Sequence, residues 1–301
     1  MKSVFRFPLD LGRAELVTEQ SIRFATTGTI TVKEADEIIT EDVRDFPIEV
    51  RVVPKGAGGD GIRNSQDWLE LHLAGRPERY QPFIQQFASE VAEKLAFFYP
   101  GLHIEGGFSE AERIPENENE VAEVGEERHL VSISIREVDP NIPFSRDHLS
   151  LVPHMAGLER IIRQFNSARQ ATSAIDQYIG MYKIIETLFY HGRGHAILVL
   201  KESSELRDIL RNAYTVRQSD DEPWTSPDDE SIDSMIVDIV KMRDQCAHLR
   251  EHNAFGYAPG DTAVFREVEP MVGIISSAAR EAIRRRIDEK SGGRLPNLPP
   301  P

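Results

Sequence analysis

The chain has 301 residues and a formal net charge of −15 at pH 7. A chain of this length has room for two domains of ordinary size. Residues 1–150 contain 16 Lys and Arg against 28 Asp and Glu, a net of −12, while residues 151–301 contain 19 against 22, a net of −3. The acidity belongs to the first half, which argues against nonspecific duplex binding because such binding depends on neutralising phosphates.

The sequence leads us to expect a soluble cytoplasmic protein that makes no contact with a membrane. No run approaches the ~18 apolar residues of a spanning helix. The N-terminal segment alternates like a strand and lacks the continuous apolar core of a signal peptide. The single cysteine, Cys246, excludes an internal disulfide and fits a reducing compartment.

The expected fold class is α+β, with a mixed α/β domain over 1–145 that has antiparallel-type strands and a sensor or regulatory role. Alternation of apolar and polar residues predicts half-buried strands at 5–11, 21–27, 47–53, 68–73 and 129–136. Apolar residues at helical spacing predict a helix over 77–99. The glycine-rich segment Gly56–Gly61 lacks the Lys-Ser/Thr of a phosphate-binding loop, so it predicts a hairpin loop. Residues 106–127, which are rich in glutamate, predict a mobile acidic loop.

Two X-Pro steps predict a domain boundary near residues 145–150. Beyond it, apolar residues at steps of three and four predict an all-α bundle over 150–290. Its helices are expected at about 154–169, 170–191, 195–216, 229–250 and 262–289. The Pro-rich segment 291–301 predicts a disordered tail.

An arginine and a histidine, Arg243 and His248, lie near the end of the helix expected at 229–250. On an ideal helix, five residues separate them by roughly 140° in azimuth and about 7.5 Å in rise, so they do not share a face. Either the helix must end or bend between them, or the site must be completed from elsewhere.

The Arg-x4-His spacing follows a helix that closes in Glu186, Leu188 and Phe189. This combination resembles the HEPN superfamily of helical domains, in particular its ApeA-like branch, over roughly residues 165–290. Active members of that superfamily are metal-independent ribonucleases whose paired motif helices line one cleft. The resemblance therefore implies a homodimer through the C-terminal bundle, RNA as a ligand, and neither a metal nor another cofactor.

The resemblance also implies a role for each residue of the motif. His248 would be the general base toward a ribose 2′-hydroxyl, since an imidazole titrates near neutral pH. Arg243 would hold the scissile phosphate with its planar fork. Asp244 would orient these two side chains, and Glu186 would support them. Asp244 departs from the polar amide that often follows the arginine in active members, and it adds negative charge beside the phosphate position.

A second interpretation treats these residues as structural. Arg243 and Asp244 would then be solvated helix-end charges, Cys246 and Ala247 would pack, and His248 would cap the helix. The layout of the whole chain also resembles that of the methylamine utilisation protein MauJ family, which supplies no mechanism. On this alternative the protein is a non-catalytic dimeric accessory or scaffold protein.

Other candidate sites are less specific. His191 and His195 flank Gly-Arg-Gly, a sequence more typical of a surface turn than of a zinc site. His248 and His252, with Cys246 nearby, are likewise more typical of a helix end than of a metal site. The last helix carries a basic cluster that either complements the helix dipole or contacts an RNA backbone, namely Arg280, Arg284, Arg285, Arg286 and Lys290.

Overall fold

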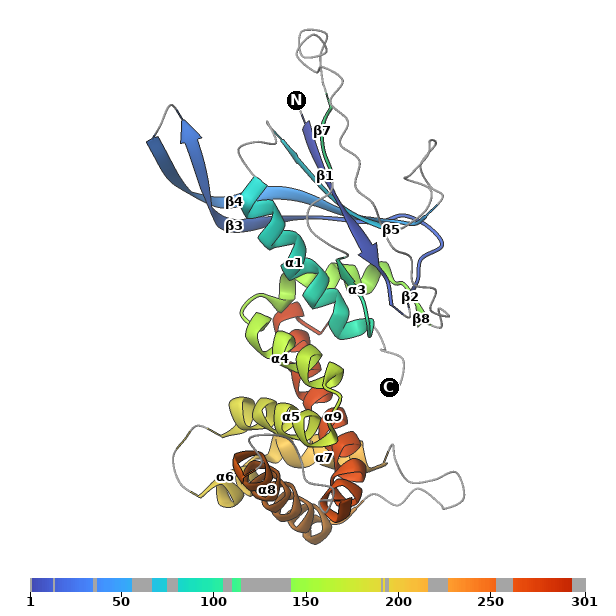
Figure 1. The fold of residues 1–301 in the computed structure, drawn as a ribbon, viewed down its shortest axis with the longest axis vertical. Coiled ribbons are helices and arrows are strands. Elements are labelled where there is room, and N and C mark those ends of the chain that lie inside the picture. The colour runs from blue at the N-terminus through green and yellow to red at the C-terminus, as the bar shows by residue number, and fades with distance from the viewer. Residues whose placement is uncertain are drawn as a thin grey trace. The chain divides into compact units, whose positions relative to one another are not determined.

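The computed structural model describes residues 2–12, 14–34, 37–55, 67–74, 81–104, 110–114, 142–190, 192, 195–215, 227–252 and 262–293. The chain divides into two compact units, Met1–Glu159 and Arg160–Pro301. The first holds an antiparallel sheet with helices, and the second is all helical (Figure 1). The α+β class expected from the sequence is therefore confirmed.

The sheet of the first unit has the strand order β3-β4-β5-β1-β6, and β7 also pairs with β1. Its strands are β1 (Lys2–Asp10), β3 (Gln20–Glu34), β4 (Glu37–Val53), β5 (Asp67–Ala74), β6 (His103–Ile104) and β7 (Glu110–Ile114). Two short strands, β2 (Ala14–Glu15) and β8 (Ile142–Pro143), pair in parallel. Four of the five expected strands are confirmed by β1, β3, β4 and β5. The expected strand 129–136 and the loop Gly56–Gly61 lie outside the described residues.

Alternation along β5 explains the two different faces of this sheet. Leu69, Leu71 and Leu73 are buried, and the helix α1 (Gln81–Phe98) packs on the sheet, confirming the helix expected at 77–99. The intervening residues Glu70 and His72 point to the opposite face. One period-two pattern thus gives β5 an apolar face that is buried against α1 and an opposite face that carries ion pairs.

The ion-paired face is centred on Glu70. Its Oε1 accepts a hydrogen bond from Arg6 Nε of the neighbouring strand β1 at 2.7 Å, and its Oε2 lies 2.9 Å from His72 Nε2. Burial alone would raise the pKa of Glu70, but the hydrogen bonds and charges of His72 and Arg6 outweigh it and lower that pKa to about 2.

The prediction of a loop over the whole of 106–127 is wrong for residues 110–114. Residues Glu110–Ile114 form β7, which pairs with β1 in antiparallel register from Lys2↔Ile114 to Arg6↔Glu110. Backbone pairing to an otherwise open strand edge prevails here over the charge repulsion on which the loop prediction rested. Residues 106–109 and 115–127 lie outside the described residues.

The first unit extends to Glu159 and includes the segment after residue 141. The boundary between the units therefore lies later in the chain than the expected 145–150. The segment forms α3 (Arg146–Leu151) and a 3-10 turn, η3 (Val152–Met155). The hydroxyl of Tyr99 accepts a hydrogen bond from the Ser145 N–H at 2.7 Å and lies 2.7 Å from His148 Nδ1. The buried His148 ring also stacks on Phe98, with centroids 4.6 Å apart. These contacts tie α3 to the end of α1.

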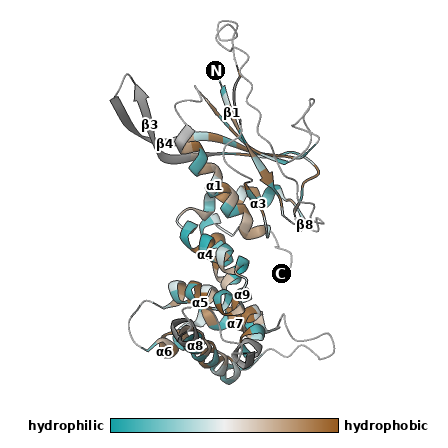
Figure 2. Ribbon diagram, viewed as in Figure 1, coloured by the Kyte–Doolittle hydropathy of each residue, from teal (hydrophilic) through white to brown (hydrophobic). Residues whose placement is uncertain are grey.

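The second unit consists of helices at positions close to those expected. They are α4 (Glu159–Gln170), α5 (Ala174–Phe189), α6 (Ala196–Glu202), α7 (Ser204–Thr215), α8 (Asp229–His252) and α9 (Thr262–Ser291). The helix α5 packs along α9 and also contacts α8. Brown and teal residues lie side by side on α5 in Figure 2, in keeping with one buried and one exposed side.

The prediction of a single helix over 195–216 is wrong in one respect, because the helix is interrupted at Ser203. This residue has φ −76 and ψ 101, outside the helical region, and it separates α6 from α7. Its hydroxyl accepts a hydrogen bond from the Leu206 N–H at 3.2 Å, as an N-cap does. Serine therefore starts a new helix where apolar spacing alone predicts continuity.

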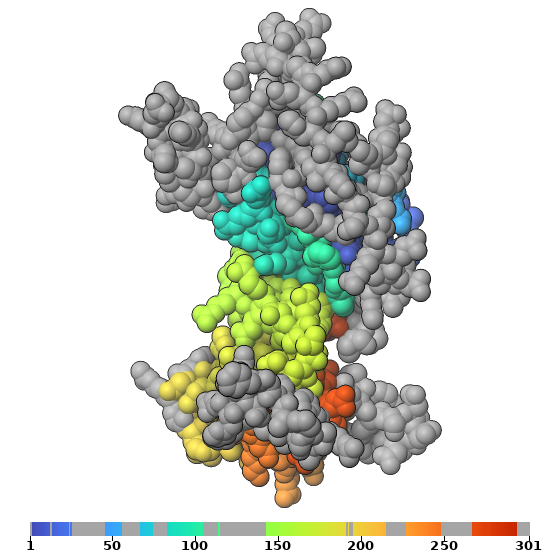
Figure 3. Space-filling view, in the orientation of Figure 1, coloured from blue at the N-terminus to red at the C-terminus, as the bar shows by residue number. Residues whose placement is uncertain are grey.

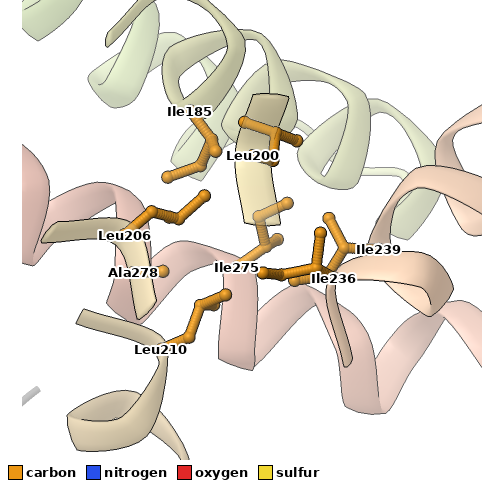
Figure 4. A pocket seen from close by; sticks show the side chains of 8 residues that line it. All are labelled: Ile185, Leu200, Leu206, Leu210, Ile236, Ile239, Ile275 and Ala278. Carbon is orange, nitrogen blue, oxygen red and sulfur yellow. The ribbon is translucent and has the colours of Figure 1, made fainter. Parts of the chain in front are cut away.

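The core of the second unit encloses one small apolar void, drawn in Figure 4. It is lined by Ile185, Leu200, Leu206, Leu210, Ile236, Ile239, Ile275 and Ala278. Its volume is about 10 Å³, at the lower limit for one water, and its lining offers no polar partner. This void is a packing defect and not a ligand site.

No helix in the described ranges is long and apolar enough to cross a membrane.

Candidate functional site

The motif residues Arg243 and His248 both lie inside α8, which continues to His252. The helix therefore does not end between them, and its backbone sets them on different faces, roughly 140° apart. The side chain of His248 lies outside the described part of the structure. One α8 helix alone does not present the pair as a unit.

Arg243 is held by residues of α5 as well as by its neighbour in the chain. Its guanidinium lies over the ring of Tyr182 at 5.1 Å. Nη2 lies 3.9 Å from Glu186 Oε1, and Nη1 lies 3.0 Å from Asp244 Oδ1. Tyr182 and Glu186 are one helical turn apart, so both present their side chains to the same stretch of α8. The structure thus brings together Arg243, Asp244 and Glu186, three of the four residues expected at the site.

The structural interpretation of the motif holds for some of these residues and fails for Arg243. Its side chain is 32% exposed and packs on an aromatic ring, so it is not a freely solvated helix-end charge. Asp244 is 55% exposed, and Cys246 is fully buried, as that interpretation expects.

The electrostatics at this site favour the charged guanidinium. Burial lowers the pKa of Arg243, but the Tyr182 hydroxyl, Asp244 and Glu186 outweigh that effect and raise it. Burial raises the pKa of Tyr182, which therefore remains a neutral phenol. The Tyr182 hydroxyl and the Arg243 Nε are both buried, and neither makes a hydrogen bond of normal length and angle. Tyr182 and Arg243 therefore interact on the inner side of the site without a hydrogen bond of good geometry.

The thiol of Cys246 contributes packing to this region. Burial raises its pKa to about 11, so it stays protonated near neutral pH and is a poor metal ligand or nucleophile. Among the side chains that the structure describes, no group of three His, Cys, Asp or Glu residues could hold a metal ion. His191 lies outside the described residues, and His195 precedes α6 as its N-cap residue.

The basic cluster expected on α9 is largely paired with acidic residues. Glu281 lies 3.5 Å from Arg284 and 3.4 Å from Arg285. Arg286 contacts Glu205 of α7 at 2.8 Å and Glu289 at 2.9 Å. Much of this cluster therefore stabilises the bundle and is not a free cationic surface.

Tyr182, which lies under the guanidinium of Arg243, was not among the residues expected at the site. The available signal was its spacing, four residues before Glu186 on the same face of α5.

Comparison of the chain with protein-family models, with curated proteins and with solved structures gives no match.

Proposed function

We propose that the second unit is a HEPN-type bundle that dimerises through α8 and binds and cleaves RNA without a metal. The observation that carries this proposal is the support of Arg243 by a second helix, through Tyr182 at 5.1 Å and Glu186 at 3.9 Å. Such support orients a guanidinium that still has one side open to solvent. An oriented arginine is what recognition of a phosphodiester requires.

The reaction that fits these residues is an attack by the ribose 2′-oxygen on the adjacent phosphorus. His248 takes the proton of the 2′-hydroxyl, and the new O–P bond forms as the bond to the 5′-oxygen breaks. Arg243 stabilises the charge that develops on the phosphate oxygens. A second copy of His248, in its protonated form, supplies the proton that the leaving 5′-oxygen needs. The products are a 2′,3′-cyclic phosphate and a 5′-hydroxyl.

The proposal needs two copies of the chain because of the helix geometry. Within one copy, the backbone positions of Arg243 and His248 lie about 140° apart around a continuous α8. Two antiparallel α8 helices related by a twofold axis would face the arginine of one copy with the histidine of the other. The dimer is thus part of the active site in this proposal.

A second candidate function, a non-catalytic dimeric accessory or scaffold protein, is favoured by the ion pair between Arg243 and Asp244 at 3.0 Å. Together with Glu186, this places two carboxylates around one guanidinium. The local surplus of negative charge opposes the approach of a phosphate. In this case the motif would only assemble the dimer.

The two candidates are separated by an assay of the full chain on single-stranded RNA in EDTA. We compare wild type with Arg243→Ala, with His248→Ala, and with Arg211→Ala as a control, since Arg211 pairs with Asp208 and Asp229 on the same unit. Loss of a general base typically lowers a rate ~10²–10⁴-fold, so both motif variants should approach background.

Sedimentation of each variant should show a dimer, so that a lost activity is not mistaken for lost assembly. Cleavage that needs Mg²⁺, or that persists in His248→Ala, would contradict the mechanism. A wild-type dimer that neither binds nor cuts RNA would identify the accessory function. A wild-type monomer would exclude both.

A further inference from the structure

The strands β3 and β4 extend beyond the rest of the sheet of the first unit as a two-stranded arm. In the part of the chain that the structure describes, β4 pairs with β5 over Glu49–Val53, whereas its pairing with β3 continues to Glu37. The arm consists of Gly28–Glu34 and Glu37–Val43, in register from Gly28↔Val43 to Glu34↔Glu37. Figure 1 shows the arm, in blue, projecting past β5.

The outer side of β3 in this arm is an open strand edge. β3 is the last strand in the order β3-β4-β5-β1-β6, so among the described residues no strand pairs with the outer side of Gly28–Glu34. Near β5, by contrast, α1 packs on one face of the sheet, and its outer side is visible in turquoise in Figure 3. A two-stranded ribbon alone is only marginally stable in water. Its open edge offers unpaired N–H and C=O groups to a strand of another chain.

The two strands of the arm differ in charge. Gly28–Val32 contains no charged residue, and the uncharged run begins at Ala25. The facing stretch Glu37–Val43 contains three acidic residues and no basic one, namely Glu37, Glu41 and Asp42. Charged residues on an edge strand commonly prevent it from pairing with another copy of itself. In this arm β4 carries such charges, and the uncharged part of β3 does not.

The open edge of β3 is regular and compatible with its own copy. The register shifts between Thr26 and Gly28, and the pairing beyond that point is regular to Glu34, which leaves a straight edge centred on Thr31. The β-branched residues Thr29–Val32 at this centre favour a strand. Antiparallel pairing of two copies about Thr31 would place Ile30 opposite Val32, Thr29 opposite Lys33 and Gly28 opposite Glu34. No two like charges then face each other.

We propose that the outer edge of Gly28–Glu34 pairs with the same edge of a second copy of this chain, antiparallel and about a twofold axis at Thr31. The same surface serves both copies, and the product is a four-stranded ribbon with the two β4 strands outermost. Three strand spacings, ~14 Å, then separate the acidic β4 strands. This distance exceeds the Debye length of ~8 Å at physiological ionic strength, so their repulsion is largely screened. The contact belongs to the first unit and does not involve α8.

The first test is disulfide cross-linking of the full chain. The native Cys246 is fully buried and burial raises its pKa to about 11, so an introduced cysteine is the reactive thiol. Thr31→Cys should give a disulfide-linked dimer under mild oxidation at micromolar concentration, seen on a non-reducing gel. Opposite residues of an antiparallel pair have Cα atoms ~4.5–5.5 Å apart, within the ~4.4–6.8 Å that a disulfide spans.

Two further cysteine variants are the controls for this cross-link. Thr40 is the register partner of Thr31 on β4, so Thr40→Cys introduces the same residue at the same level of the arm. Its two copies would lie ~14 Å apart and should not be linked. Thr29→Cys tests the register, because residue 29 would lie opposite Lys33 and not opposite its own copy. It should also remain unlinked.

The second test disrupts the contact with charge and needs no covalent bond. Thr31→Lys would place two lysines opposite each other, whereas Thr40→Lys adds the same charge to β4. Sedimentation of the full chain over a dilution series should show that Thr31→Lys associates about tenfold or more weakly than wild type and Thr40→Lys.

The proposal is overturned if Thr31→Cys gives no linked dimer or if Thr40→Cys or Thr29→Cys is linked as readily. It is also overturned if Thr31→Lys associates as Thr40→Lys does. A wild-type chain that sediments as a monomer would exclude the second copy in favour of a strand from a different protein.

Discussion

The hydroxyl of Tyr178 on α5 donates a hydrogen bond to the backbone carbonyl of Ile239 on α8, at 2.7 Å. In the α-helical pattern this same carbonyl accepts the backbone N–H of Arg243. One carbonyl therefore joins α5 to the helical turn that ends at the motif arginine. Tyr182, one turn further along α5, then lies under the guanidinium of Arg243. The register between the two helices is fixed by a bond that involves no residue of the motif.

Two tyrosine substitutions on α5 should differ in their effect on stability. Tyr178→Phe removes the hydrogen bond to Ile239, and we expect it to cost ~1 kcal/mol of unfolding free energy, since burial raises the pKa of Tyr178 and keeps it a donor. Tyr182→Phe removes a buried hydroxyl that makes no hydrogen bond of good geometry, so stability should be unchanged or higher. Denaturant unfolding measures both, and equal losses would contradict the assignment.

Substitution of Gly180 tests the close approach of α4 and α5. Alanine is the better helix former by about 1 kcal/mol, but its Cβ would clash with Ala168. Overpacking typically costs about 1–3 kcal/mol, so we expect Gly180→Ala to be destabilising overall. Adding Ala168→Gly should recover part of the loss, because it removes the atom that the new Cβ meets. A stabilised single variant would show that the helices can separate freely.

Glu70 should make the first unit sensitive to acid. Its folded-state pKa is about 2 against an ordinary value of 4.5, so its stabilising effect is present above about pH 4.5 and is lost as the pH falls toward about 2. The stability advantage of wild type over Glu70→Gln should narrow across that range. A constant difference down to pH 2 would show that the contacts with Arg6 and His72 do not depend on the charge of Glu70.

Asp67, on the same strand, provides a control of opposite sign. Burial raises its pKa above 3.8, so the folded state binds a proton more readily than the unfolded state. As the pH falls toward 3.8, the unfolding free energy of wild type should therefore rise relative to that of Asp67→Asn. Asparagine keeps an acceptor for the Lys55 N–H, which Asp67 accepts at 2.9 Å.

The Tyr99 hydroxyl should stabilise the contact between the end of α1 and α3. Tyr99→Phe removes the acceptor of the Ser145 N–H and the hydroxyl beside His148 Nδ1. Loss of a buried partner typically costs about 1–3 kcal/mol. His148→Phe should cost less, because it keeps the stacking on Phe98 and the bond between Tyr99 and Ser145. The reverse order in denaturant unfolding would contradict this account.

The parts of the fold that were predictable from the sequence are those where burial imposes a period. Period-two alternation in β5 and the three-and-four spacing in α5 and α8 each reflect one face that must leave water. Glu186, which lies 3.9 Å from Arg243, was expected at the site because of the resemblance of the motif and not because of the helical spacing. Tyr182 was missed because a buried aromatic residue gives the same pattern whether it fills the core or supports a cation.

Features that depend on a partner distant in the chain were not predictable in this way. The strand Glu110–Ile114 has three charged residues among its five, and only pairing with β1 makes it a strand. The break at Ser203 was missed for another reason, since a local side-chain hydrogen bond prevails there over apolar spacing.

The helix α9 contains Pro270 in its interior. Proline has no backbone N–H, so the carbonyl of Arg266 lacks its usual donor four residues later, a defect worth ~3 kcal/mol in an isolated helix. Beyond it, Ile275, Ala278, Ala279, Ala282 and Ile283 are buried and anchor the helix. In partial unfolding, α9 should therefore shorten from its beginning, with Thr262–Glu269 exchanging amide hydrogens as one group before the anchored turns open.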